Sequence, residues 1–350
     1  MLWRNSATPT QRSLRAVSPT STNPTCARLP AIDRSIDPQL IERFRSDLET
    51  VWPDRGEGSL ALAVSGGPDS TALLLLAHAA MAGRIEAATV DHGLREGAAV
   101  EAEMVAAFCA ELEVPHRTLR VHVGPGNMQD SARRARYLAL ADWAKERGLA
   151  ALATAHHADD QAETLLMRLN RGSGVAGLAG VRPRGLVPGS GLVLLRPLLG
   201  WRREELGRVV RAADAPVAND PSNADERFDR VRLRRALTDA DWIDSLAVAA
   251  SAGHLADADA ALDWTVDREW LEAVTEVVDG LRYVPVAPRA VRIRIVARII
   301  SQLGEMPRGG ATARLVDLLE VGSAGSLGGV LAKVENEIWH FVREPKIRKN

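Results

Sequence analysis

Two serines, two glycines and an aspartate lie within the six-residue stretch Ser65-Gly66-Gly67-Pro68-Asp69-Ser70. Glycines leave backbone N–H groups open to the close approach of an anion, and the serine hydroxyls add further donors. The apolar run that follows predicts a helix, whose N-terminus carries about half a positive charge. These features predict a phosphate-binding loop. It is not a Walker loop, because no lysine occurs between residues 60 and 78.

A second polar cluster, residues 155–164, reads AHHADDQAET and follows an apolar stretch. Asp160 and Glu163 are three residues apart, so they share one face of a helix. Carboxylates at the end of a buried strand are unfavourable in a core but suit Mg²⁺ or an ammonium group. The HExxH spacing of a zinc site is absent, and no cysteine is near. A helix N-cap would explain one aspartate but not the rest of the cluster.

Arginines form three further groups. Arg95 follows the apolar stretch 85–90, and a charged group at a strand end points into the same crevice as the loop. Arg133, Arg134 and Arg136 begin a helical stretch, where they form either a solvated face or a contact with RNA or phosphate. The third group is Arg227, Arg230, Arg232, Arg234 and Arg235. Its density indicates contact with an RNA backbone, but the acidic residues among these arginines also allow a salt-bridged surface helix.

These residues need a scaffold that brings strand ends together. Short apolar runs predict strands at 60–64, 85–90, 116–123, 149–154 and 192–195. The stretches between them predict helices, including 98–112, 131–147 and 202–213. Strands that alternate with helices indicate a parallel sheet covered on both faces. We therefore expect the α/β class, with a doubly wound, mostly parallel sheet and a smaller, mainly helical C-terminal domain.

The chain is expected to contain three parts. Residues 1–36 are rich in serine, threonine and arginine, which predicts a disordered extension or, alternatively, a transit peptide. Residues 37–218 form the nucleotide-binding domain, and its first helix starts at Asp37-Pro38. Residues 219–350 form the mainly helical, RNA-binding domain. Its predicted elements are helices at 242–278, 289–303 (with a basic face) and 311–319, and a final hairpin that pairs 330–334 with 338–342.

The composition is that of an ordinary globular protein. Its 350 residues are 46% hydrophobic and 25% charged, and the net charge is −1, so an RNA site must be a local patch. The two cysteines, Cys26 and Cys109, are far apart and form no CxxC pair. That spacing argues against a disulfide framework, an iron–sulfur cluster or a structural zinc site. Cysteine usage of this kind fits a reducing cytoplasm. No apolar run reaches the ~20 residues of a membrane span.

The loop Ser-Gly-Gly-x-Asp-Ser resembles that of the PP-loop ATP pyrophosphatases, and the chain is similar to one group among them, the tRNA(Ile)-lysidine synthetases. The resemblance rests on segments in family order, which cover roughly residues 60 to 235: 65–70, 90–95, 132–137, 155–164, 168–174, 196–199, 220–223 and 227–232.

The resemblance implies a two-step reaction. ATP adenylates the C2 oxygen of the wobble cytidine in a tRNA(Ile) with a CAU anticodon, and pyrophosphate leaves. The ε-amine of free L-lysine then displaces AMP, which gives lysidine. ATP and Mg²⁺ are the implied cofactors, and the expected location is the cytoplasm.

The resemblance also implies roles for particular residues. Ser65, Gly66, Gly67, Pro68, Asp69 and Ser70 bind the nucleotide. Asp69 and Asp159 are the expected Mg²⁺ ligands. Asp160 and Glu163 hold the ammonium of lysine, and one of them or a nearby histidine accepts its proton. With Asp69 and Arg95 they form the expected catalytic set. Arg133, Arg227, Arg230 and Arg232 contact lysine or tRNA.

Three other functions remain open at this point. A PP-loop thiolase would place sulfur on C2 of a tRNA pyrimidine, but such enzymes commonly use paired cysteines. A small-molecule amidotransferase would need a glutaminase domain or a nucleophilic cysteine. A non-catalytic RNA-binding protein would not need an intact loop with its carboxylates. The sequence leaves the oligomeric state open, with a homodimer as one expectation.

Overall fold

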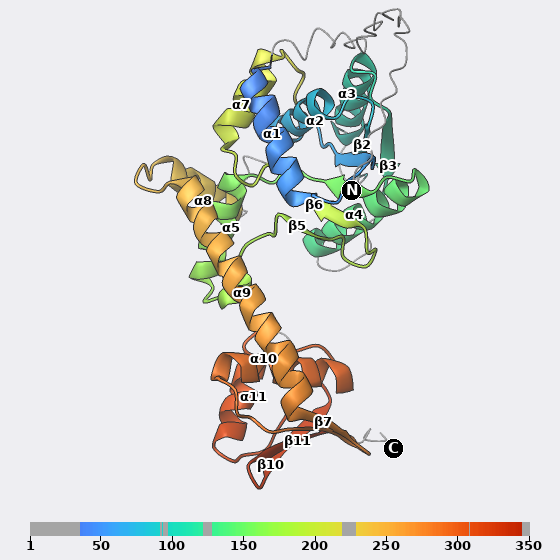
Figure 1. The fold of residues 1–350 in the computed structure, drawn as a ribbon. Coiled ribbons are helices and arrows are strands. Elements are labelled where there is room, and N and C mark those ends of the chain that lie inside the picture. The colour runs from blue at the N-terminus through green and yellow to red at the C-terminus, as the bar shows by residue number, and fades with distance from the viewer. Residues whose placement is uncertain are drawn as a thin grey trace, which may run out of the picture.

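The structure is a computed structural model that describes residues 36–91, 93, 97–121, 128–218, 229–307 and 309–344. The predicted N-terminal extension therefore lies outside the described residues, apart from Ile36. Figure 1 shows two groups of elements joined by one long helix. The first group surrounds a six-stranded sheet and the second surrounds a five-stranded sheet.

The six-stranded sheet has the order β3-β2-β1-β4-β6-β5. Its strands are β1 (Leu60–Ala63), β2 (Ile85–Asp91), β3 (His116–Arg120), β4 (Ala151–Ala153), β5 (Arg184–Leu186) and β6 (Val193–Leu195). All neighbouring pairs are parallel except β5 with β6. In the register, Leu60 of β1 lies between Ile85 of β2 and Ala151 of β4. The predicted α/β class is confirmed. The short edge strand β5 was not predicted.

Helices cover both faces of this sheet. One face packs against α1 (Pro38–Val51), α2 (Pro68–Ala80), α3 (Gly97–Glu111) and α7 (Arg203–Ala212), which share a core with buried Phe44, Leu74 and Trp201. The other face packs against α4 (Met128–Glu146) through Tyr137, Leu140 and Trp143. Asp37 caps α1 by accepting a hydrogen bond of 2.9 Å from the N–H of Gln39, as the sequence predicts.

The strand order reverses between β1 and β4. β2 and β3 extend the sheet on the side of β1, and β6 and β5 extend it on the side of β4. Open α/β sheets bind ligands in the crevice at such a switch point, outside the carboxyl ends of the strands. The loop 65–70 follows β1 and the cluster 155–164 follows β4. The topology therefore places the two polar motifs at this crevice.

A helical layer connects the two sheets. It contains α5 (Ala158–Asn170), α6 (Val175–Leu178), α8 (Asp229–Thr238) and the 29-residue helix α9 (Ser245–Ala273). α9 packs along α5 and α6 near its start and reaches the second sheet at its end (Figure 1). The helix that carries the carboxylates is thereby held against the connecting helix.

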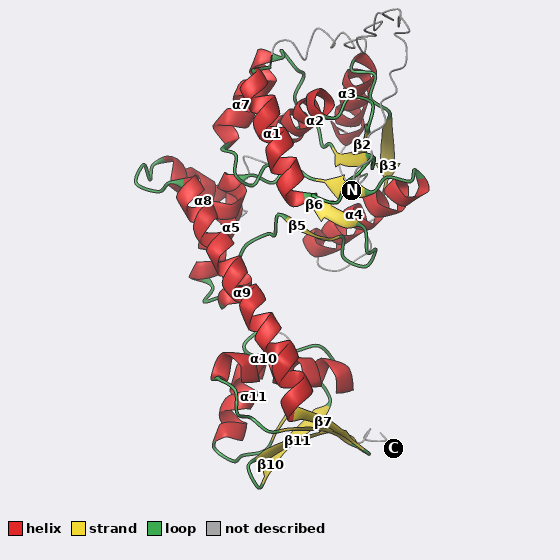
Figure 2. Ribbon diagram, viewed as in Figure 1, coloured by secondary structure: helices red, strands yellow, loops and turns green. Residues whose placement is uncertain are grey.

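The second sheet contains more strands than predicted. The predicted hairpin is confirmed as β10 (Val330–Glu335) with β11 (Ile338–Arg343). It extends into a sheet of order β7-β8-β11-β10-β9 that includes β7 (Val274–Val277), β8 (Gly280–Tyr283) and β9 (Gly325–Leu327) (Figure 2). α10 (Arg289–Leu303) and α11 (Ala311–Glu320) pack on it through Ile295, Ile299 and Leu315. Residues 274–278 were predicted to be helical, but Val274–Val277 are a strand because they pair with β8.

The predicted basic face of α10 is neutralised. Arg292 lies 3.2 Å from Glu320 and Arg298 lies 2.8 Å from Asp267, while Arg289 pairs with Asp317 and Arg294 with Asp259 and Asp263. These arginines therefore join helices to one another.

The domain boundary predicted between residues 218 and 219 adjoins residues 219–228, which lie outside the described residues. The boundary therefore stays a prediction. Within the described residues, none of the helices has both the length and the apolar character needed to cross a membrane.

Candidate active site

The loop 65–70 has a shape that depends on glycine at position 66. Gly66 has φ +86°, and a Cβ there would lie 3.1 Å from Val105 Cγ2. The Ser70 hydroxyl accepts a hydrogen bond from the N–H of Ser65 (3.2 Å) and donates one to the Gly67 carbonyl (2.9 Å). The Ser65 hydroxyl lies 3.2 Å from that of Ser70. Both hydroxyls thus hold the loop in shape. Within the described residues, no side chain accepts a hydrogen bond from the N–H groups at the start of α2 as a cap.

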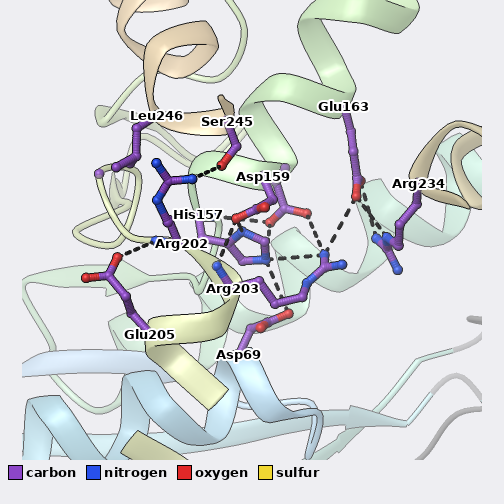
Figure 3. Close-up of polar contacts among 12 residues, drawn as sticks. Asp69, His157, Asp159, Glu163, Arg202, Arg203, Glu205, Arg234, Ser245 and Leu246 are labelled. Atoms are coloured by element: carbon purple, nitrogen blue, oxygen red, sulfur yellow. Dashed lines mark hydrogen bonds and ion pairs between the residues drawn. The ribbon is translucent and has the colours of Figure 1, made fainter. Parts of the chain in front are cut away.

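His157 joins the loop to the second polar cluster. Its side chain is fully buried, with Nε2 3.4 Å from Asp69 Oδ2 and 3.5 Å from Asp160 Oδ2. On the other side, Nδ1 lies 3.4 Å from Asp159 Oδ2 (Figure 3). At these distances the contacts are ion pairs and not short hydrogen bonds. The imidazole therefore separates the two predicted metal ligands, Asp69 and Asp159.

The two neighbouring histidines have opposite charge states. Burial alone would lower the pKa of His157, but Asp159 and Asp69 raise it to about 9, so the ring is cationic at neutral pH. His156 has its pKa lowered to about 3 by burial and by nearby arginines, of which Arg196 acts most strongly. It is neutral, and its Nδ1 lies 2.9 Å from the Thr154 hydroxyl. Burial alone would raise the pKa of Asp159, but hydrogen bonding to His157 and to the backbone N–H of Arg203 lowers it to about 2.

Asp160 and Glu163 face arginines of α8. Glu163, whose side chain is 2% exposed, accepts hydrogen bonds from Arg230 Nε (2.6 Å) and Arg234 Nε (2.8 Å). Asp160 accepts one from Arg230 Nη2 (2.7 Å) and also caps α5 through the N–H of His157 (3.2 Å). Burial raises the pKa of Glu163, but Arg234 and Arg230 lower it below its usual value. The two carboxylates already bind cationic groups here, so the predicted lysine ammonium would have to share or displace the guanidinium groups.

The remaining predicted residues fall into two groups. Arg133 lies on α4 above the Tyr137 ring, and Arg232 pairs with Asp229 on the surface of α8. Arg95 and Arg227 lie outside the described residues. The roles predicted for all these residues remain predictions.

Several residues at the site were not predicted. His157 was quoted in its motif and considered only as one of the nearby histidines that could accept a proton. Arg234 was counted only as part of a dense group. Arg203 begins α7, and its Nη2 lies 3.7 Å from Glu163 Oε1 and 3.4 Å from His157 Nε2 (Figure 3). The signal for His157 in the sequence was its place in the short segment between β4 and α5, just before Asp159 and Asp160.

The donor set at Asp69 fits a magnesium ion. Asp69 Oδ1 is buried and has no hydrogen-bond partner within the described residues. In the described part of the chain, no three His, Cys, Asp or Glu side chains converge as a metal cage. Mg²⁺ commonly takes one or two carboxylates and completes its shell with water and substrate phosphates. Asp69 suits that mode of binding. Asp159, on the other side of the His157 ring, is the second candidate ligand.

We expect the free energy of unfolding to fall more between pH 6.5 and pH 9 in the native protein than in His157→Gln. The pKa of this histidine rises from 6.5 to about 9 on folding, so folding favours the protonated ring. The resulting stabilisation is complete below pH 6.5 and is lost as the pH rises through 9; the shift corresponds to about 3 kcal/mol at most. Urea unfolding followed by tryptophan fluorescence measures it.

The control for this experiment is His254→Gln, because His254 is exposed on α9. This variant should retain the pH dependence of the native protein. Equal pH dependence of the native protein and His157→Gln would contradict a cationic His157.

Comparisons with known proteins give independent information about the family of the chain. Residues 40–241 match the family model of the PP-loop domain. The chain is similar to the tRNA(Ile)-lysidine synthase of Novosphingobium aromaticivorans, with 46% identity over 313 residues that cover 88% of this chain and 95% of that protein. It is also similar to the tRNA(Ile)-lysidine synthase of Zymomonas mobilis, with 40% identity over 316 residues and the same coverage of 88% and 95%.

Among solved structures, the chain is similar to the U34-tRNA thiolase NcsA from Methanococcus maripaludis with its 4Fe–4S cluster. The TM-score is 0.50 at 16% sequence identity, and the match covers 62% of this chain and 78% of that chain. At this identity the similarity shows a shared fold.

Proposed function

The chain belongs to the tRNA(Ile)-lysidine synthases of the PP-loop family, and from this membership we propose that it ligates free L-lysine to C2 of the wobble cytidine in a tRNA(Ile) with a CAU anticodon. It is an ATP-dependent ligase. The products are lysidine, AMP and pyrophosphate. The observation that carries the proposal is the 46% identity over 95% of a curated relative, together with the carboxylates assembled around His157.

The residues of the loop suit the adenylation step. Negative charge grows on the departing pyrophosphate, and donors that are already in place stabilise it without reorganisation. The N–H groups at the start of α2 and the cationic His157 supply positive charge where a Walker loop would use lysine. Asp69, with Asp159 as the second candidate, would hold Mg²⁺, which neutralises phosphate charge when bound.

The residues of α5 suit the second step. Asp160 and Glu163 form an anionic pair on one face of the helix, and we propose that they hold the ammonium of lysine in exchange for Arg230 or Arg234. Arg95, Arg227 and Arg232 stay proposed contacts for nucleotide or tRNA. His157 is already protonated at neutral pH, so it does not accept the proton of lysine there.

The thiolase alternative is not favoured. Cys109 is buried, and burial raises the pKa of its thiol to about 12, so it is unsuited to carry sulfur. The similarity to a tRNA thiolase lies at 16% identity and concerns the fold alone. A cytoplasmic location and a homodimer complete the proposal as expectations.

The function is tested with the full chain, ATP, Mg²⁺, isotope-labelled lysine and a tRNA(Ile) transcript with a CAU anticodon. Nuclease digestion and mass spectrometry should find labelled lysine on the wobble nucleoside, with none on a tRNA(Met) control. Release of AMP and pyrophosphate with an unmodified cytidine would overturn the lysine step and direct the search to another nucleophile.

Asp160→Asn should raise the apparent KM for lysine by about 10- to 100-fold and change that for ATP much less. A hydrogen bond to a charged group is worth about 1.5–3 kcal/mol, and the amide keeps the shape but loses the charge. Steady-state kinetics with each substrate varied in turn measures the two effects. Asp142→Asn, an exposed change on α4, is the matched control. Equal effects on lysine and ATP would exclude the lysine-binding role.

A further inference from the structure

The connecting helix α9 carries a buried carboxylate at its midpoint. The buried residues of α9 are Ala252, Asp259 and Val266, which recur every seven residues and therefore lie along one face of the helix. Val266 belongs to the apolar core of the second sheet, whereas Asp259, two turns earlier, is a carboxylate that is only 6% exposed. A buried carboxylate is costly unless opposite charges pair with it. The partners of Asp259 therefore identify the elements that meet at this point of α9.

Each oxygen of Asp259 binds an arginine from a different part of the chain. Oδ2 accepts a hydrogen bond from Nη2 of Arg182, which lies between α6 and β5. Oδ1 accepts one from Nη2 of Arg294 on α10 (2.5 Å). Arg294 also donates to Asp263, one turn further along α9. We call Asp259, Arg182 and Arg294 the α9 joint.

The Arg182 side of the α9 joint is fixed to α5, the helix of the site carboxylates. Gln161 of α5 is 5% exposed, and its side chain accepts a hydrogen bond from the Val181 N–H (2.9 Å) and donates one to the Val181 carbonyl (2.8 Å). Gly180 has φ +64°, and a Cβ there would collide with Gln161 Oε1. Gln161 directly follows Asp160. The backbone next to Arg182 is thus bound one residue away from a carboxylate of the site.

The Arg294 side of the α9 joint is fixed to the C-terminal unit, the group of elements around the second sheet. Arg294 precedes Ile295, which is fully buried in the core of that unit. Burial alone would lower the pKa of Arg294, but Asp259 and Asp263 raise it, so the guanidinium stays charged. The side chain of Asp263 is 66% exposed and that of Asp259 is 9% exposed. Asp259 is therefore the buried partner that holds α10.

An ionic contact at this point of α9 favours one orientation of the two units. Apolar side chains of similar volume would stabilise the packing about as well, because desolvation offsets much of the attraction in a buried ion pair. Apolar surfaces can slide on one another, whereas the two oxygens of Asp259 are both satisfied only when Arg182 and Arg294 keep their positions. Figure 1 shows that α9 is the long helix between the two units, so its contacts determine the angle between them.

We propose that Asp259 is a positioning residue for the reaction: it fixes the C-terminal unit against α5, so that a tRNA in contact with both presents its nucleotide to the site at a defined distance. This inference rests on the proposed function for the identity of the substrate. A substrate as large as a tRNA can touch both units, whereas ATP and lysine bind in the crevice. Loss of the α9 joint therefore affects the use of tRNA and spares the binding of ATP.

The test is lysidine formation by the full chain with Asp259→Asn, over a series of tRNA concentrations at saturating ATP and lysine. Asparagine keeps the shape of the side chain but loses the charge that holds both guanidinium groups. We expect kcat/KM for tRNA to fall by about 10- to 100-fold and the KM for ATP to change by about twofold or less, because a small misplacement of reacting groups is enough to slow a reaction.

Two control variants separate positioning from charge and from stability. Asp263→Asn removes the same charge from the same helix and also touches Arg294, but the side chain is exposed. Val266→Ala leaves a gap on the same buried face of α9 and keeps all three residues of the α9 joint. Both controls should retain the kcat/KM of the native protein for tRNA. Equal losses in Val266→Ala and Asp259→Asn would show that only stability matters and would overturn the proposal.

Two further outcomes would contradict the proposal. One is a native kcat/KM for tRNA in Asp259→Asn, and the other is a loss of ATP affinity as large as the loss with tRNA. Arg182→Gln keeps the test decisive if Asp259→Asn does not fold, because the Arg182 side chain is 34% exposed. It should show the same loss, and adding Arg294→Gln should not multiply that loss, since each change breaks the same joint. Losses that multiply would overturn the joint.

Hydrogen exchange of the free protein tests the α9 joint without the reaction. In Asp259→Asn the amides of residues 177–182 should exchange about tenfold faster, because Arg182 no longer anchors this segment to α9, while the hairpin β10–β11 keeps its native rates. Native exchange rates at residues 177–182 would overturn the joint. A native protein that forms no lysidine, with faster exchange in Asp259→Asn, would instead reject the proposed reaction and keep the contact between the units.

Discussion

Asp69→Asn is expected to lower the rate of AMP release in the presence of tRNA by at least about 100-fold, because loss of one preorganised group that stabilises transition-state charge costs about 10²- to 10³-fold. Asp69 is the second residue of α2, and its Oδ1 is buried without a partner within the described residues. Its Oδ2 faces the cationic His157 at 3.4 Å. Asparagine keeps the shape of the side chain but loses the charge that would hold Mg²⁺.

The measurement is AMP release over a range of Mg²⁺ concentrations, with Asp142→Asn as control. A second readout is the titration of His157, because loss of the Asp69 charge should lower the pKa of the imidazole. A rate within threefold of the native protein at every Mg²⁺ concentration would exclude Asp69 from adenylation. A low rate with an unchanged histidine titration would instead indicate a misplaced loop.

Glu163→Gln is expected to lower the free energy of unfolding by about 2 kcal/mol. Removing one partner of a buried ion pair costs about 3–5 kcal/mol, and the arginines reduce that cost because they can turn toward water. Glu163 is 2% exposed and binds Arg230 and Arg234, whose side chains are 43% and 33% exposed. Glutamine leaves Arg234 without its carboxylate, whereas Arg230 keeps Asp160 at 2.7 Å. Urea unfolding at neutral pH measures the change.

A double-mutant cycle with Arg234→Gln isolates the pair. We expect a coupling free energy of about 1–3 kcal/mol between Glu163 and Arg234. The control is Glu146→Gln, which breaks an exposed pair with Arg117 at 3.5 Å and should cost about 0.5 kcal/mol or less. A coupling energy near zero would show that α8 is not held by Glu163.

The arginine-rich segments show that a high local density of arginine does not by itself reveal what each arginine contacts. The arginines of α8 were predicted as RNA contacts or as a salt-bridged surface helix, and those of α10 as a basic face. In the structure, Arg230 and Arg234 bind Glu163, and Arg294 and Arg298 bind aspartates of α9. The density of arginine in the sequence did not identify these ion pairs, because the partners lie 31 to 71 residues away in the sequence.

The sequence by itself determined the α/β fold, the loop after β1, the carboxylates after β4 and the family. These features depend on local order: an apolar run, then glycine and serine, then a helix former. Strand ends of a parallel sheet meet at one edge, so motifs that follow β1 and β4 had to converge.

Only the tertiary structure decided the charges at the site. His156 and His157 are identical residues next to each other, yet one is neutral among arginines and the other is cationic among aspartates. The reason is that a side chain's pKa depends on burial and on charges within a few ångströms, which come from α2, α4, α7 and α8. The same packing determines that Glu163 faces two arginines in the absence of substrate, a contact between residues 67 and 71 positions apart.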